Sequence, residues 1–145
     1  MTSVLELTRE AFRCADAHDV DGFLEFQAAD CEWRTPQGPL HGHDEVRAYV
    51  GGFQTAFSEG PHEIDRAYPI GDTAVVVEGH WTGKHTGTLT TPDGDVPATG
   101  RDVDLPFVLI VERKGSSDQA GRLALYYDQL AFMGQLGLMP EPAAA

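Results

Sequence analysis

Basic residues are scarce in this sequence of 145 residues: ten lysines and arginines stand against 23 acidic residues, and the formal net charge is −13. Such a surface repels phosphate groups, which argues against nucleic acid or an anionic membrane as a partner. No run of 18 apolar residues is present, so no membrane-spanning helix is expected. The first residues lack the basic and apolar regions of a secretion signal, and we expect a cytoplasmic protein.

Cysteine is almost absent as well. Cys14 lies in a helical pattern and Cys31 in a strand pattern, and their spacing fits no metal or redox motif, so both are predicted to be buried free thiols. The pair His41 and His43 has no third metal ligand at a suitable spacing and is better explained by helix capping. No phosphate loop, dinucleotide fingerprint or nucleophile elbow is found. We therefore expect neither a metal nor a cofactor.

Apolar residues at helical spacing occupy the first half of the chain, and period-two alternation occupies the second half. Predicted helices cover about 3–17, 19–26 and 42–57, with a short last helix after Asp128. Predicted strands cover 30–35, 63–70, 73–82, 103–113 and 122–128, with a turn at 36–39. Helices followed by sequential strands indicate an α+β fold in which three N-terminal helices pack on a strongly curved, mostly antiparallel sheet that encloses a pocket. Residues 1–139 are expected to form one domain and 140–145 a disordered tail.

A family resemblance rests on three segments of the sequence: 81–87 (WTGKHTG), 98–103 (ATGRDV), and Tyr127-Asp128-Gln129 with the following 135–137 (QLG). Together they resemble the SnoaL-like polyketide cyclases and ester cyclases of the cone-shaped NTF2-like superfamily. The resemblance implies ring closure by intramolecular aldol condensation without metal or cofactor. In such enzymes an aspartate removes a proton next to a carbonyl group, and hydrogen bonds in the pocket hold the enolate.

The resemblance places Asp128 at the position of this general base and His85 at the mouth of the pocket. It also implies a homodimer joined through the outer face of the sheet, where Val75, Val77 and Leu109 are the expected apolar contacts.

The residues around Asp128 support the same role. A carboxylate among aromatic side chains loses hydration, and its pKa rises toward the range of a general base. The alternative is an ionised carboxylate that caps the following helix. Tyr126 shares the strand face of Asp128, so its hydroxyl is a candidate donor to an oxyanion, although a buried tyrosine often only satisfies its own hydroxyl.

A second acidic candidate is Asp104, where a cyclase of this type has histidine. If Asp104 and Asp128 face each other, they form a coupled pair suited to epoxide opening, in which one carboxylate activates water and the other protonates the leaving oxygen. The epoxide hydrolases of the superfamily place an arginine two residues before one aspartate, whereas this sequence has Asp102. The alternative is that these acidic residues are simply exposed on a solvated face of the sheet.

Four further residues are candidates for the site. His80 is in phase with Glu78 and is either an acid or base, or part of an outer or dimer face. Arg101 is a candidate for binding an anionic group or for a surface ion pair. Trp33 and Phe53 belong to the aromatic core and are predicted to contact the substrate, with Trp33 lining a flat polycyclic ligand.

These residues lead to three hypotheses. The first is a cofactor-free cyclase or isomerase that acts on a hydrophobic, carbonyl-bearing, polyketide-like small molecule. The second is an epoxide-opening hydrolase or hydroxylase-type relative that uses the pair of aspartates. The third is a non-catalytic module that binds a small molecule.

Overall fold

The structure is a computed structural model that describes residues 2–58, 60–91 and 93–139; the expected disordered tail at 140–145 lies outside the described residues. In chain order the elements are α1 (Val4–Asp16), α2 (Val20–Leu24), β1 (Gln27–Thr35), β2 (Gly38–His41), α3 (Gly42–Ala56), β3 (His62–Ile70), β4 (Ala74–Lys84), β5 (Leu89–Thr91), β6 (Gly94–Val96), β7 (Asp102–Arg113), β8 (Ala120–Tyr127) and α4 (Gln129–Gln135).

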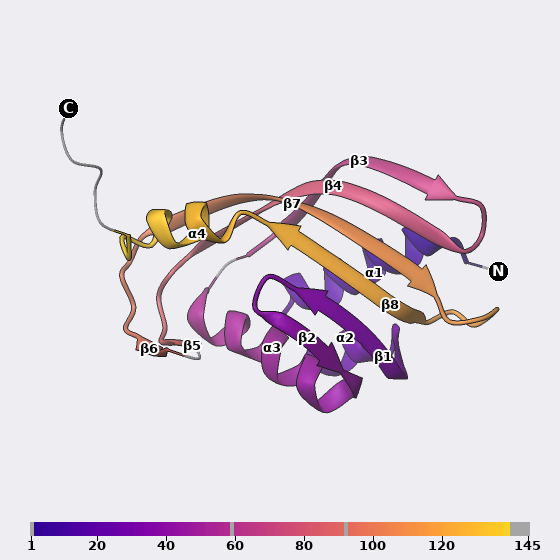
Figure 1. Cartoon of the computed structure of the whole chain (residues 1–145), viewed down its shortest axis with the longest axis horizontal. Helices are drawn as coiled ribbons and strands as arrows, with labels where there is room; N and C mark the ends of the chain where they lie inside the picture. The colour runs from indigo at the N-terminus through magenta and orange to yellow at the C-terminus, as the bar shows by residue number, and fades with distance from the viewer. Residues whose placement is uncertain (1, 59, 92, 140–145) are drawn as a thin grey trace.

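Six strands form one sheet in the order β2-β1-β8-β7-β4-β3, and β5 and β6 form a separate hairpin. Strand β1 runs parallel to β8, and the other neighbours are antiparallel. Helices α1 to α3 lie along one side of the bending sheet (Figure 1). The predicted α+β architecture with three N-terminal helices on a curved, mostly antiparallel sheet is confirmed, and α4 adds a fourth helix at the end of β8.

Local sequence signals explain the helices. The Ser3 side chain accepts the Glu6 backbone N–H at the start of α1, and the apolar stripe of α1 is buried against the sheet. Cys14 and Cys31 are buried free thiols, as predicted. The turn expected at 36–39 is shorter than predicted, because β2 begins at Gly38 and pairs with β1. In the described part of the chain, no helix is long and apolar enough to cross a bilayer.

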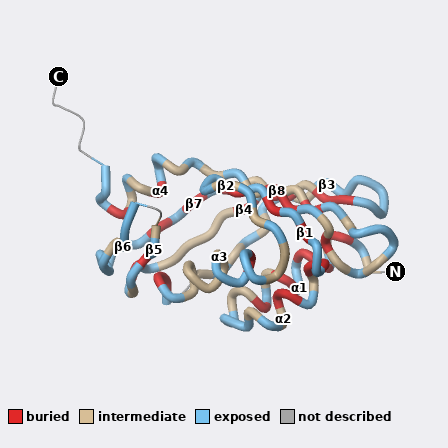
Figure 2. The backbone as a smooth tube through the Cα atoms, turned by 60° about the horizontal axis from the view of Figure 1, so that its bottom comes forward, coloured by how far each residue is buried: buried red, intermediate tan, exposed pale blue. Residues whose placement is uncertain are grey.

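The alternation of the strands decides which side chains reach the interior. Odd-numbered residues of β4 and β7, and of β8 from Leu123 to Tyr127, face the helices, and the even-numbered residues between them face outward. A register shift at the start of β8 turns Ala120 inward as well. Val75, Val77 and Leu109 are therefore buried core residues, and the expectation that they form an outer dimer face is wrong. Figure 2 shows buried segments where α1 and α2 meet the sheet, whereas β6 is exposed.

Candidate functional site

A cavity of about 170 Å³ lies between the sheet and the helices α1 and α3. Its walls are mostly apolar and come from the inner stripe of α1, from α3 and from the inward positions of β4, β7 and β8. The aromatic members of the wall are Phe12, Phe23, Phe26, Trp33, Tyr49, Phe53, Phe57, Trp81, Phe107 and Tyr127. Trp33 and Phe53 thus line the cavity, which agrees with their predicted position.

A histidine of the cavity wall is held by a carboxylate behind it. His62, the first residue of β3, lines the cavity, and its Nδ1 lies 2.5 Å from Oδ1 of Asp16, the last residue of α1. The His62 backbone N–H also donates to both Asp16 oxygens, at 3.1 and 3.2 Å. Both side chains are only about a quarter exposed, at 26% and 28%. The carboxylate therefore holds the histidine through its backbone and its ring.

The chemistry of this pair follows from its hydrogen bonds. A carboxylate oxygen accepts, so Nδ1 of His62 carries a proton and Nε2 of the neutral ring is left with a lone pair. The ring stacks on Phe12 at a centroid distance of 4.6 Å and meets Phe107 edge-on at 6.0 Å. These contacts fix the plane of the imidazole, and Asp16 fixes its tautomer. This is the arrangement that a general base requires.

Two tyrosine hydroxyls form the second polar group of the cavity. Tyr49 of α3 donates to Oε1 of Gln37 at 2.9 Å, and Nε2 of Gln37 donates to the Tyr127 hydroxyl oxygen at 2.5 Å and to Oε1 of Gln129 at 2.9 Å. Because Tyr127 accepts from Gln37, its own O–H remains able to donate. Burial raises the pKa of both tyrosines, which keeps both hydroxyls protonated.

Asp128 does not face this cavity. It is exposed, and its Oδ1 accepts the Ala131 backbone N–H at 3.0 Å as the N-cap of α4. The helix-cap alternative is confirmed and the pocket-facing expectation is wrong, because Tyr127 and not Asp128 occupies the inward position at the end of β8. Tyr126 is 48% exposed on the outer face of the sheet, so it does not line the cavity either.

Asp104 and Arg101 are exposed and lie outside the cavity. The backbone of Asp104 exchanges two hydrogen bonds with the Gln135 side chain, at 2.8 and 2.9 Å, which ties α4 to β7. The Arg101 guanidinium lies close to Gly137, where an added Cβ would come 2.8 Å from it. The catalytic roles of Asp104 and Asp128 stay predictions. Neither side chain lines the cavity, so a ligand inside it would not contact them.

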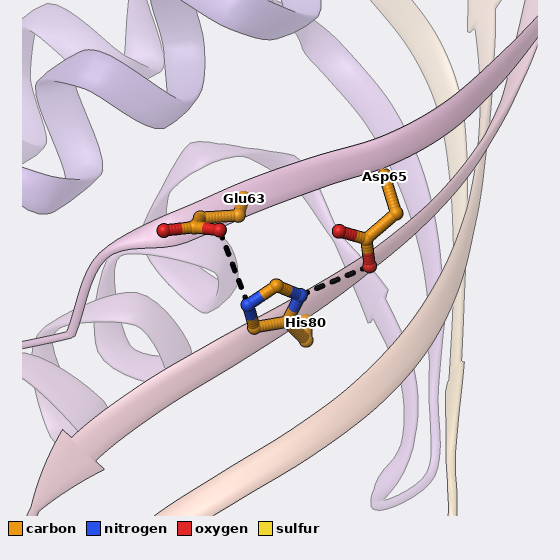
Figure 3. A group of neighbouring side chains, drawn as sticks. All are labelled: Glu63, Asp65 and His80. Carbon is orange, nitrogen blue, oxygen red and sulfur yellow. Dashed lines mark hydrogen bonds and ion pairs between the residues drawn. The ribbon is translucent and has the colours of Figure 1, made fainter.

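His80 lies on the outer face, as one of its two interpretations predicted. Figure 3 shows it between Asp65 and Glu63 of the neighbouring strand: Nδ1 lies 2.9 Å from Asp65 and Nε2 lies 3.2 Å from Glu63. The hydrogen bond to Asp65, and then the negative charges around the ring, raise the pKa of His80. Both ring nitrogens face carboxylates, which stabilises the imidazolium form and leaves that form no lone pair for a metal ion.

His85 is fully buried and does not lie at the cavity rim, so the expectation of a mouth position is wrong. It directly follows β4 and lies against a second apolar cluster, with its ring 5.2 Å from that of Phe57. The Thr99 backbone N–H donates to Nδ1 at 3.2 Å, which places the ring proton on Nε2. This buried Nε2 has no hydrogen-bond partner among the described residues.

The sequence analysis missed His62, Asp16 and Tyr127 as site residues. Two signals pointed to them. Asp16 lies four residues after Phe12 and so continues the inner stripe of α1, and Tyr127 shares the parity of Leu123 and Leu125. The inward position of His62 was harder to derive, because a register shift between Ile64 and Arg66 interrupts the alternation of β3.

Residues 8–117 match the family model of the SnoaL-like domain. No curated protein matches the chain. Among solved structures, the chain resembles a candidate SnoaL-like polyketide cyclase from Jannaschia sp. CCS1, with a TM-score of 0.77, 19% identity, and coverage of 94% of this chain and 92% of that one. It also resembles AclR from Streptomyces galilaeus, a candidate hydroxylase, with a TM-score of 0.77, 16% identity, and coverage of 96% and 88%.

A third structure is an NTF2-like protein of unknown function from Burkholderia pseudomallei K96243, with a TM-score of 0.74, 22% identity, and coverage of 94% of this chain and 98% of that one. At these identities the structural likeness establishes a common fold and leaves the chemistry open. The family match spans most of the sequence and contains His62, Asp16 and the greater part of the cavity wall. The protein belongs to the SnoaL-like domain family.

Proposed function

We propose that this protein is a cofactor-independent acid–base enzyme of the cyclase or isomerase type, acting on a hydrophobic small molecule that bears a carbonyl group. The observation that carries the proposal is His62 in the wall of an apolar cavity, with Asp16 bound to its Nδ1. It replaces Asp128 as the base that the geometry supports best.

The proposed reaction begins with removal of a proton from the carbon next to the carbonyl group. Nε2 of His62 takes this proton, and Asp16 stabilises the imidazolium that forms. The enolate oxygen then needs a donor in a water-poor site, and the Tyr127 hydroxyl, held by Gln37, is the candidate. Return of the proton from His62 to another atom of the molecule gives isomerisation. Attack of the enolate carbon on a second carbonyl carbon of the same molecule gives ring closure, and the alkoxide that forms takes the proton from the His62 imidazolium.

The test is exchange of deuterium from solvent into the α-position of a panel of hydrophobic ketones, followed by NMR. His62→Gln removes the base while keeping a polar side chain, and exchange should fall by about 10²- to 10⁴-fold. Asp16→Asn should reduce exchange less, because the ring loses its orientation but keeps Nε2. His41→Gln, a histidine change at an exposed position before α3 and outside the cavity, is the matched control and should exchange at the wild-type rate.

The same assay decides the competing interpretations. Asp128→Asn retains a good N-cap residue and should leave both stability and exchange near the wild-type values. Loss of exchange in Asp128→Asn or Asp104→Asn with wild-type rates in His62→Gln would return catalysis to the aspartates. Tight ketone binding with no exchange in the wild type would support the non-catalytic binding module.

We also propose a homodimer that forms through the outer face of the sheet. Its outward positions carry the exposed Tyr68, Ile70 and Tyr126 beside the half-buried Val108 and Ile110. Val76 of β4 joins them, because it pairs with Tyr68 of β3 and with Ile110 of β7, and Val108 of β7 pairs with Tyr126 of β8. These side chains therefore form one apolar surface across adjacent strands. A second copy related by a two-fold axis would cover this surface with the same residues.

A further inference from the structure

The cavity has room for about one six-membered ring. Its volume is about 170 Å³. An engineered apolar cavity of about 150 Å³, lined by leucine, isoleucine and phenylalanine side chains, binds a single benzene molecule. A fused second ring would add four carbon atoms to the six of the first, whereas this cavity is only slightly larger than the one that benzene occupies. A fused polycycle is therefore too large for it.

The aromatic wall of the cavity is held in place by contacts between neighbouring rings. The Tyr49 ring meets that of Phe53 at a centroid distance of 5.2 Å, and Phe53 meets Trp81 at 6.0 Å. Trp81 in turn lies 6.4 Å from His62, whose ring stacks on Phe12 at 4.6 Å. These distances are typical of directly packed rings. Because each ring packs on the next, a wider cavity would require several of them to move together, so we expect the size limit to hold when a ligand binds.

Hydrogen bonds within the protein already occupy much of the polar part of the wall. The Thr8 hydroxyl donates to the Val4 carbonyl at 2.8 Å, and the Trp33 indole N–H donates to Gln27 at 3.0 Å. A ligand hydroxyl or carboxylate placed against these groups would lose its hydrogen bonds to water without gaining these donors in return. This part of the wall thus favours an apolar ligand surface.

Arg113 brings a positive charge to the wall, but its guanidinium binds acceptors outside the cavity. It donates to the carbonyls of Thr2, Asp72 and Ser117 and to the Asp118 carboxylate, and none of these residues lines the cavity. The Asp118 carboxylate also balances the charge of the guanidinium. An anionic ligand would gain little from this arginine, and we therefore expect an uncharged ligand.

Phe107 lies on a strand between those that carry the proposed base and the proposed oxyanion donor. Its ring meets that of His62 at 6.0 Å, and its backbone on β7 pairs with that of Tyr127 on β8. All three side chains line the cavity. A ketone beside Phe107 would therefore have the imidazole on one side and the tyrosine hydroxyl on the other.

From this volume and polarity we infer that the substrate is a compact ketone: an uncharged molecule of the size of one six-membered ring, with few polar groups beside its carbonyl group. The inference deepens the proposed function and relies on it for the position of the carbonyl group next to His62. It departs from the flat polycyclic ligand that Trp33 led us to expect from the sequence.

Isothermal titration calorimetry with two ketones that differ by one fused ring tests the size limit. Acetophenone should bind about tenfold more tightly than 2-acetylnaphthalene, because forcing further atoms into a packed cavity is unfavourable. Transfer of apolar surface from water would by itself give the opposite order, since the larger ketone buries more carbon. 4-Hydroxyacetophenone, which adds one hydroxyl group to acetophenone, should bind about tenfold more weakly than acetophenone.

Two variants change the size of the cavity. Leu109→Ala enlarges it at an inward position of β7 and should raise the affinity for 2-acetylnaphthalene about tenfold. Ala11→Leu fills part of it and should weaken acetophenone about tenfold. Leu130→Ala and Ala48→Leu make the same exchanges at exposed positions outside the cavity and should bind both ketones like the wild type. Leu125→Ala, on the neighbouring strand, replaces Leu109→Ala if circular dichroism shows that Leu109→Ala does not fold.

Equal or tighter binding of 2-acetylnaphthalene by the wild type, an unchanged preference in the folded enlarged variant, or equal affinity for 4-hydroxyacetophenone and acetophenone would each overturn the inference. Because these are binding measurements, their result does not depend on turnover. A preference for acetophenone without deuterium exchange in either ketone would remove the proposed function and keep the size limit. Exchange in both ketones with no size preference would do the reverse.

Discussion

The pKa values of His80, in β4, and His85, just after β4, are shifted in opposite directions because their surroundings differ. His80 is flanked by carboxylates, which stabilise its charged form, whereas His85 is enclosed by apolar side chains and burial lowers its pKa. A neighbouring negative charge raises the pKa of a histidine, whereas loss of hydration lowers it. Residue type alone therefore does not determine whether a histidine in this fold is charged.

At the residue scale we predict that His85 makes the fold sensitive to acid. Its folded pKa lies below the unfolded value of about 6.5, so unfolded chains take up a proton first as the pH falls. The free energy of unfolding should decrease as the pH falls below about 6.5. Urea denaturation of wild type and His85→Gln at pH 7.5 and 5.5 measures this, and the variant should lose less stability between the two pH values. Equal losses would contradict the prediction.

At the scale of elements, β3 is an edge strand of the sheet and is attached to β4 on one side only. Its backbone pairing is interrupted between Ile64 and Arg66, next to the point where Glu63 and Asp65 reach across to His80. The start of the same strand carries His62. The ion pairs of His80 with Glu63 and Asp65 thus hold the segment of β3 that carries His62.

We therefore predict that the β3–β4 contact weakens at alkaline pH. The folded pKa of His80 is raised, so its contribution to stability is fully present below about pH 6.5 and is lost as the pH rises through the folded pKa. Amide hydrogen exchange of β3, corrected for the intrinsic effect of pH, should become faster between pH 6 and 8 in the wild type. In His80→Gln the corrected rates should be the same at both pH values, and high salt should reduce the difference in the wild type.

At the scale of the whole molecule, the two faces of the sheet have different roles in the proposals made above. Its inner face forms the cavity, and its outer face carries the apolar surface proposed for the dimer. The net charge of −13 keeps copies of the chain apart at long range, so association depends on burying this apolar surface.

The dimer prediction is tested by sedimentation. We expect the wild type to sediment as a dimer, and Ile110→Asp, at the centre of the outer face, to sediment as a monomer with an intact fold. Thr90→Asp, at the exposed position of β5, adds the same charge elsewhere and should remain dimeric. A monomeric wild type at micromolar concentration would remove the proposal.

Much of the architecture follows from local patterns. The helical spacing of Leu7, Ala11 and Cys14 and the alternation of residues 103–111 establish helices and strands before any contact is known. The cap at Asp128 was also available from the sequence, since aspartate before a helix is a common N-cap.

Tertiary structure decided which face of each strand becomes the interior, and with it the site. Alternation separates Tyr126 and Asp128 from Tyr127, but only packing against the helices shows that the face of Tyr127 is the buried one. The pair Asp16–His62 joins residues 46 positions apart in the sequence. The register shift in β3 interrupts the alternation that would otherwise predict an inward position for His62. Sequence periodicity is a property of neighbouring residues, whereas this pair exists only because the end of α1 folds onto the start of β3.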